Sequence, residues 1–249
     1  MSPATTTTTT ESAPLIIAPS DAVLPLGVPV KFSSQGEIQP YPGNTTICHL
    51  PTASPLKPGL RKVYEVYKNH GDLSKYWRAL PPESWHVTIF DGVRTTECEP
   101  GMWPEGVEKE PLSEATRKFK TRLEELGPQL EEEGLAPPYR MRVNGFDPSQ
   151  CGAGLDVQGV DAEEQQRLRR LRDRLSEVCG FRAPNHERYN LHLTIAYLLL
   201  PIYGKDKKEI ERLQKELMPE LAVEFELGSL EFCTFENMDH FERLIYVSG

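Results

Sequence analysis

Two short stretches of the sequence each place a threonine two residues after a histidine within an apolar run. They are "SWHVTIF" at 84–90, which holds His86 and Thr88, and "NLHLTIAY" at 190–197, which holds His192 and Thr194. Two imidazoles can divide acid and base roles near neutral pH, and hydroxyl groups can donate hydrogen bonds to phosphate oxygens. We expect these four catalytic residues to act on a phosphodiester without a metal or a cofactor.

Both stretches are expected to be β-strands, in which side chains alternate between two faces. His86 and Thr88 then point to one face while Val87 and Ile89 point to the other, and the second stretch repeats the pattern. If the two strands face one another across a cleft, two imidazoles and two hydroxyls converge on it. The competing interpretation is two histidines with satisfied hydrogen bonds in a core, and the repeated spacing favours the catalytic pair.

The elements around the two motif strands also repeat. The first half predicts a strand at 44–50, a helix carrying Leu56 to Tyr67, the motif strand, a helix from Leu112 that ends near Gly127, and a strand at 139–146. The second half predicts a strand at 152–159, a helix opened by Asp161 and closed by Gly180, the motif strand, a helix at about 205–217, a strand within 222–235, and a hairpin return at 241–247. The repeated order predicts an α+β fold, a bilobal pseudo-twofold repeat of β-α-β units with the H-x-T strands facing a central groove.

We expect a flexible N-terminal arm over residues 1–40, with a short ordered piece around 24–32, followed by one domain at 41–249 with lobes at about 41–148 and 149–249. The net charge of −9 disfavours an extended nucleic-acid surface. No apolar run is long enough for a membrane span, and no secretory signal is evident, so we expect a cytoplasmic protein, with the nucleus as the alternative location. We also expect a monomer. The five cysteines lack a C-x-x-C pair and are interpreted as reduced structural residues.

The motif strands resemble those of the 2H phosphoesterase superfamily, which includes cyclic phosphodiesterases and enzymes acting on 2′-5′ RNA linkages. Within it, "PYPGNTTICHLP" and "ESWHVTIFDGV" are similar to an uncharacterised branch found in bacteria and fungi. The resemblance covers roughly 40–249. It implies that His86 and His192 take the acid and base roles and that Thr88 and Thr194 hold the phosphate.

Three functions remain open at this point. The first is hydrolysis of a 2′,3′-cyclic phosphate or a related cyclic nucleotide or RNA end. The second is cleavage or ligation of 2′-5′ RNA linkages in the same groove, and the third is a non-catalytic module that binds a nucleotide or an RNA end. Each takes a small nucleotide or RNA end as its ligand in a local pocket.

Other residues are weaker candidates. Asn44, grouped with Thr46 and Cys48 on the expected groove face, is predicted to bind substrate, and Tyr41 is predicted to stack on a base, although turn and packing roles compete. Trp85 is assigned to the core. The five arginines between 167 and 174 are interpreted as a solvated face, and His49, His70 and His240 as structural or exposed residues.

Overall fold

The computed structural model describes residues 24–95, 101–148 and 153–248. Along the chain its elements are β1 (Gly43–His49), α1 (Lys57–Asn69), β2 (Trp77–Ala79), β3 (His86–Arg94), α2 (Leu112–Glu132), β4 (Tyr139–Phe146), β5 (Gly154–Gly159), α3 (Ala162–Cys179), β6 (His192–Thr194), β7 (Ala196–Leu198), α4 (Gly204–Leu221), β8 (Glu224–Leu227), β9 (Leu230–Asn237) and β10 (His240–Ser248). Most of the predicted elements are present, and the two motifs begin β3 and β6.

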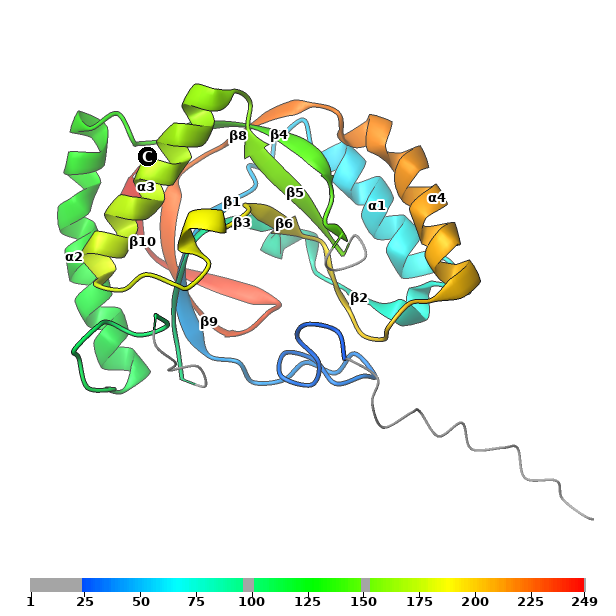
Figure 1. Cartoon of the computed structure of the whole chain (residues 1–249), viewed down its shortest axis with the longest axis horizontal. Coiled ribbons are helices and arrows are strands. Elements are labelled where there is room, and N and C mark those ends of the chain that lie inside the picture. Colours follow the sequence, from blue (N-terminus) through cyan, green and yellow to red (C-terminus); the bar gives the residue numbers. More distant parts are fainter. Residues whose placement is uncertain (1–23, 96–100, 149–152, 249) are drawn as a thin grey trace, which may run out of the picture.

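An antiparallel eight-stranded sheet, curled as a half-barrel, dominates the α+β fold (Figure 1). Its strand order is β10-β9-β1-β3-β6-β5-β4-β8, and β2 pairs with β7 in a separate small sheet. The two motif strands are therefore immediate neighbours at the centre of one sheet.

The sheet exchanges strands between the two halves of the sequence. The C-terminal strands β9 and β10 lie beside β1, whereas β4, from the first half of the sequence, pairs with β5 and β8. Each motif strand thus ends a group of four strands drawn from both halves of the chain. The predicted lobes at 41–148 and 149–249 stay a prediction about domain organisation.

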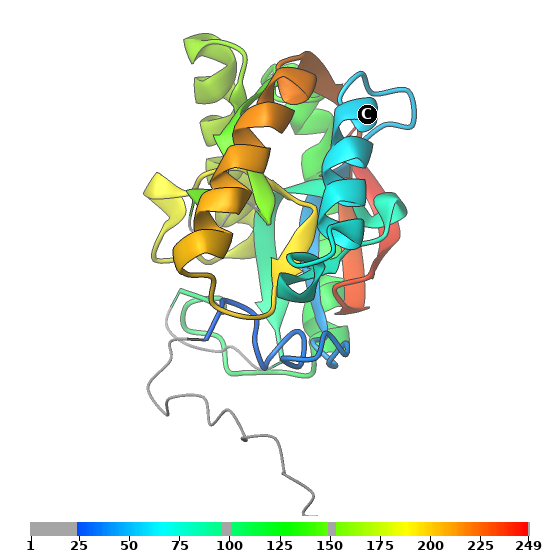
Figure 2. The same ribbon diagram turned by 90° about the vertical axis from the view of Figure 1, so that its right-hand side faces the viewer.

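Helices cover the sheet in two pairs. The pair α1 and α4 lies side by side in Figure 2, and α2 packs against α3 and β10. The main core joins apolar residues of all four helices to Val87, Ile89 and Leu193, which alternate with the motif residues along their strands. Burying this face leaves the histidines and threonines on the opposite face of β3 and β6.

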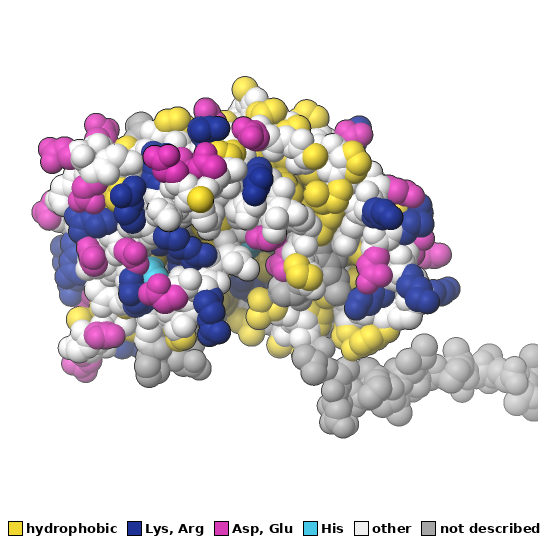
Figure 3. All heavy atoms as spheres, turned by 45° about the horizontal axis from the view of Figure 1, so that its top comes forward, with side chains coloured by type: hydrophobic (Ala, Val, Ile, Leu, Met, Phe, Trp, Pro, Cys, Tyr) yellow, Lys and Arg dark blue, Asp and Glu magenta, His cyan; other side chains and the backbone are white. Residues whose placement is uncertain are grey.

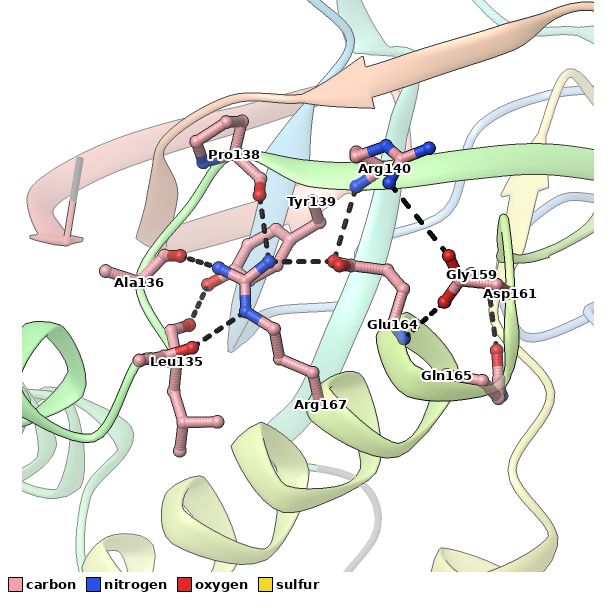
Figure 4. Close-up of polar contacts among 11 residues, drawn as sticks. Leu135, Ala136, Pro138, Tyr139, Arg140, Gly159, Asp161, Glu164, Gln165 and Arg167 are labelled. Carbon is pink, nitrogen blue, oxygen red and sulfur yellow. Dashed lines mark hydrogen bonds and ion pairs between the residues drawn. The ribbon is translucent and has the colours of Figure 1, made fainter.

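The start of α3 is held by side-chain hydrogen bonds (Figure 4). Asp161 caps the helix by accepting from the Glu164 backbone N–H at 2.9 Å, and Gly180 ends it with φ 78°, as the sequence predicted. Arg167 donates to the carbonyl oxygens of Gly134, Ala136 and Pro138, which fastens α3 to the loop before β4. The prediction of a solvated arginine face is therefore wrong for Arg167.

Three other predicted boundaries change. Helix α2 continues past Gly127 to Glu132. Gly127 is a close-packing position and not a helix end, since a Cβ there would meet the Val247 carbonyl oxygen of β10 at 2.2 Å. The second motif stretch divides into β6 and β7, which belong to different sheets. The predicted strand within 222–235 likewise divides into β8 and β9.

Residues 24–40 pack against the domain, although the sequence predicted an arm there with only a short ordered piece. Phe32 is fully buried and its ring lies 5.0 Å from that of Tyr197, while the Tyr41 N–H donates to the Glu236 carbonyl oxygen on β9. In Figure 1 this blue segment runs along the lower side of the molecule. Residues 1–23 lie outside the described part of the chain.

The cysteine and membrane predictions are tested in part. Cys48, Cys179 and Cys233 are free and buried, whereas Cys98 and Cys151 fall outside the described residues. Among the helices of the described segments, none combines the length and the apolar character needed to cross a bilayer.

Candidate active site

The two motifs lie side by side because β3 and β6 pair directly. Val87 is the antiparallel partner of Leu193, so the register sets His86 next to Thr194 and Thr88 next to His192 on the same face. Each imidazole therefore has the hydroxyl of the other motif as its cross-strand neighbour. The face predicted for each motif side chain agrees with the structure, whereas the two strands pair directly in one sheet and do not face one another across a cleft.

The two imidazoles are held by the same kind of hydrogen bond. Nδ1 of His86 lies 2.6 Å from the carbonyl oxygen of Ser84, and Nδ1 of His192 lies 3.2 Å from that of Asn190. Because a carbonyl oxygen only accepts, each Nδ1 carries the hydrogen and each neutral ring keeps its lone pair on Nε2. In both cases the proton-accepting nitrogen is the one farther from the backbone.

Burial lowers the pKa of His86. Desolvation is the largest cause, the Ser84 carbonyl opposes it, and the neighbouring His49 and His192 lower the pKa further, to about 3 from an ordinary value of 6.5. The ring of Phe241 on β10 packs against the imidazole with centroids 4.2 Å apart and contributes to this burial. In the unliganded protein, His86 is therefore a neutral imidazole at neutral pH.

Two adjoining cavities open on the motif face. The two-histidine cavity, of about 80 Å³, is lined by all four motif residues together with Tyr41, Asn44 and Asp91 among others. The β6 cavity, of about 430 Å³, is lined by His192 and Thr194 but not by the first motif. They share Lys31, His192, Thr194 and Tyr197. The four predicted catalytic residues thus meet in one space, next to a larger one.

Charged residues of the two-histidine cavity were missed by sequence reasoning. Between the pairs Thr46–Phe90 and Ile47–Thr88, β3 has one extra residue, a bulge that brings Asp91 onto the face of Thr88. Asp91 pairs with Arg94 at 3.7 Å, and Lys31 enters from the segment before β1. A bulge of this kind changes the alternation on which the sequence prediction depended.

His49 lies beside the first motif. It pairs with His86 across β1 and β3, its ring centroid is 6.0 Å from that of His86, and its Nδ1 lies 3.1 Å from Glu231 Oε2. The prediction that Cys48 shares the groove face is wrong, because Cys48 pairs with Val87 on the core face. His49 was interpreted as a structural or exposed residue because it lacks the H-x-T context.

His49, Glu231 and Cys233 bring potential metal ligands within 4.8 Å of one another. Glu231 already bonds His49 and Arg243, and burial together with Glu231 raises the pKa of Cys233 to about 12. Because zinc binds the thiolate, a metal would have to deprotonate this thiol and displace existing bonds. The donor set is therefore better explained as an ion-pair cluster next to His86.

The two predicted substrate-binding residues both line the two-histidine cavity. The Asn44 amide is engaged with the protein, since Nδ2 donates to Thr116 at 2.9 Å and Oδ1 accepts from the Val93 N–H at 3.0 Å. Tyr41 is buried, and its ring stacks on Phe235 with centroids 6.3 Å apart. These contacts give both residues a packing role, and their contact with substrate stays a prediction.

The sequence from residue 31 to 152, which includes the first motif, matches the profile of the family 2H-phosphodiest, described as a domain of unknown function (DUF1868). The chain contains a 2H-phosphodiesterase-like domain. No curated protein sequence matches the chain.

Solved structures resemble this 2H-phosphodiesterase-like domain to different degrees. A conserved protein of unknown function from Agrobacterium tumefaciens, ATU0111, is 25% identical, with a TM-score of 0.79 over 90% of this chain and 94% of that chain. Escherichia coli LigT complexed with 3′-AMP is 8% identical, with a TM-score of 0.45 over 83% of this chain and 96% of that chain. The first shares the fold, and the second is a distant similarity.

Behind the site of the 2H-phosphodiesterase-like domain, Arg172 of α3 contacts the first motif strand and the segment that precedes the second. It is 3% exposed, donates to the Ile89 carbonyl oxygen of β3, and lies 3.9 Å from the ring centre of Tyr189, which precedes β6. The solvated-face interpretation is wrong for this arginine as well. Its buried guanidinium instead joins the backbone of the first motif strand to the segment that leads into the second.

Proposed function

We propose that the protein is a metal-independent phosphodiesterase that hydrolyses a 2′,3′-cyclic phosphate or a related cyclic nucleotide or RNA-end phosphodiester. The observation that carries this proposal is the pair of imidazoles and the pair of hydroxyls that line one cavity from adjacent strands. The matching Nδ1 hydrogen bonds support it further, because they leave Nε2 of each ring for proton transfer. The family match is consistent with this chemistry.

In the proposed reaction, His86 acts as the base and His192 as the acid. A water oxygen attacks phosphorus while His86 accepts the water proton, and the bond from phosphorus to one ribose oxygen breaks as protonated His192 donates a proton to that oxygen. The product is a phosphomonoester beside a free hydroxyl. Burial keeps the free His86 neutral, and a bound anionic phosphate would raise its pKa toward the range where a base is most effective. Thr88 and Thr194 would donate to the non-bridging oxygens.

The two halves of the sheet are proposed to form one pseudo-twofold site. The strand groups β10-β9-β1-β3 and β6-β5-β4-β8 meet at the motif strands, which supports an approximate twofold axis between β3 and β6. The matching carbonyl contacts of the two histidines support the same relation. A groove with this symmetry would offer its acid and its base to opposite sides of a phosphorus atom.

A small nucleotide or a single RNA end is the proposed ligand. The β6 cavity, at about 430 Å³, falls within the usual range of small-molecule sites, roughly 300–1,000 Å³. The net charge is −9, and Figure 3 shows acidic and basic side chains interspersed over the face that it presents. Such a surface supports recognition in a local pocket over a long electrostatic track.

The test is turnover of the four common 2′,3′-cyclic nucleotides in excess chelator, with chromatography to identify the position of the product phosphate. The wild-type chain is compared with His86→Ala and His192→Ala, and His240→Ala serves as a control because His240 is an exposed residue of β10. We expect turnover by the wild type and the control, and its loss in both motif variants. A folded wild type that binds these nucleotides but leaves them unchanged would contradict the proposal.

A further inference from the structure

Lys31 occupies a position that the four motif residues do not explain. It lines both the two-histidine cavity and the β6 cavity, although it lies in the segment before β1. Its Nζ donates to the Tyr197 hydroxyl at 3.3 Å, and Tyr197 is also shared by the two cavities. The ammonium group is thus held at the junction of the two cavities, which His192 and Thr194 also line.

The backbone around Lys31 is fixed before any ligand binds. The Lys31 N–H donates to the Gly27 carbonyl oxygen at 2.7 Å, and the Lys31 carbonyl accepts from the Gln39 N–H at 2.9 Å. Gly27 has φ 99° and lies against the Tyr197 ring. Phe32, which follows Lys31 in the sequence, is fully buried. A long side chain on an anchored backbone loses less conformational freedom when it binds a ligand.

The charge of the two-histidine cavity, which Lys31 lines, favours an anion. The charged residues that line the two-histidine cavity are Lys31, Asp91 and Arg94, of which Asp91 and Arg94 form an ion pair. Within the described segments, Lys31 contacts the rings of Tyr41 and Tyr197, at 5.2 and 5.0 Å, rather than a carboxylate. Two positive charges and one negative charge leave a net +1 in the cavity when both histidines are neutral.

The hydrogen-bonding capacity of Lys31 is only partly used. An ammonium group has three N–H donors, and the Tyr197 hydroxyl accepts one of them. Tyr197 in turn directs its own O–H toward the sulfur of Met238 at 3.3 Å, which orients its oxygen lone pairs toward Lys31. The remaining donors of Lys31 are therefore available to phosphate oxygens at the cavity junction.

We infer that Lys31 is a phosphate-binding residue of this site, contributed by the segment that crosses from the N-terminal side onto the groove. This inference rests on the proposed function for its role in turnover, but not for its contact with phosphate. Lys31 would neutralise a non-bridging oxygen that the uncharged threonine hydroxyls can only hydrogen-bond. It would also hold the phosphate where the two cavities meet, with the rest of the substrate in the β6 cavity.

The first experiment measures binding of inorganic phosphate by calorimetry to the full chain and three variants. Lys31→Met removes the charge, Lys31→Arg keeps it, and Lys68→Met is a matched control, because Lys68 also contacts a tyrosine hydroxyl and ring, those of Tyr64 on α1, away from both cavities. We expect affinity to fall about 10-fold to 100-fold in Lys31→Met and to change less than about threefold in the other two. Equal affinity in Lys31→Met and wild type would overturn the inference.

A second experiment needs no variant and covers the case in which Lys31→Met does not fold. The wild-type chain is labelled with an amine-modifying reagent, with and without inorganic phosphate, and the modified lysines are measured by mass spectrometry. We expect phosphate to slow labelling of Lys31 and to leave Lys68 unchanged. Equal labelling rates of Lys31 in the two samples would contradict the inference.

Cyclic-nucleotide turnover separates this inference from the proposed function. If the wild type is active, we expect Lys31→Met to lower kcat/KM by about 10-fold to 100-fold without moving the pH optimum, because the proton-transfer groups are intact. If the wild type is inactive while phosphate binding depends on Lys31, the proposed function is wrong, but Lys31 is still a phosphate-binding residue. If the wild type is active and Lys31→Met matches it in both assays, only the inference fails.

Discussion

His86 and His192 donate the same hydrogen bond, from Nδ1 to the carbonyl oxygen of the residue two positions earlier, Ser84 in one motif and Asn190 in the other. This bond sets the tautomer of each neutral ring and the direction of its Nε2. Since β3 and β6 also pair at Val87 and Leu193, the two rings are positioned as one unit.

The histidines should therefore show strongly non-additive effects. We expect each single alanine substitution to lower kcat/KM by about 10²-fold to 10⁴-fold, and the double substitution to be within about tenfold of the slower single variant. Steady-state kinetics on one cyclic nucleotide measures this. A double variant whose loss equals the product of the two single losses would show that the rings act independently.

The threonine hydroxyls are expected to matter more than the threonine methyl groups. Thr88→Val keeps the shape of the side chain but removes the donor, so we expect kcat to fall about 10-fold to 100-fold, whereas Thr88→Ser should stay within about fivefold of wild type. The same pair of substitutions at Thr194 gives an internal comparison across the two strands. If kcat falls equally in the serine and valine variants, the loss comes from packing of the methyl group, and the phosphate-holding role is wrong.

Burial of His86 should make the protein less stable in acid. Its pKa is about 3 in the folded chain and about 6.5 when unfolded, so between these values the unfolded state binds more protons. Its contribution to stability is complete above pH 6.5 and is lost as the pH falls toward 3, at up to about 1.4 kcal/mol per pH unit.

Urea unfolding of the wild type and His86→Gln at a series of pH values measures this contribution. We expect the free energy of unfolding of the variant to fall less between pH 6.5 and 3, because glutamine has no proton to bind. His240→Gln controls for loss of an exposed histidine on β10. Parallel pH profiles for wild type and His86→Gln would show that His86 titrates normally in the folded chain.

Substitution of Asn44 distinguishes a packing role of this residue from a substrate-binding role. Its amide joins β1 to Thr116 of α2 and to the Val93 N–H of β3, so Asn44→Ala leaves buried polar groups without partners. We expect a loss of about 1–3 kcal/mol in the free energy of unfolding, measured in urea. Thr116→Val removes only one of the two bonds and should cost less. A change in KM with no change in stability would instead support the substrate-binding prediction.

The local parts of the site could be predicted from the sequence, and the long-range parts could not. Alternation within a strand was enough to place His86 with Thr88 and Val87 with the core, and the caps of α3 at Asp161 and Gly180 depend on residues within one turn. Strand neighbours are set by the whole chain, so the direct pairing of β3 with β6 had no local signal.

The missed residues have similar physical reasons. The bulge at Ile89 moves Asp91 onto the motif face, and a bulge of this kind has no reliable signature in a single sequence. Lys31 lies in a segment without periodicity, and its position depends on the burial of Phe32 against residues far along the chain. Arg172 occurs in a run of arginines, where composition favours a solvated face over the buried position that the structure shows.

The exchange of strands between sequence halves also constrains how the protein folds. Strands β9 and β10 complete the sheet beside β1, and Phe241 of β10 packs against the His86 ring. The first motif therefore acquires its final neighbours only after β10 has been synthesised. Likewise, both strand partners of β4, namely β5 and β8, come later in the chain. Contacts with such large sequence separation slow folding, and neither half should form a stable fragment by itself. The four motif residues would then come together only when the whole eight-stranded sheet has formed. Partially folded chains would therefore lack the complete site.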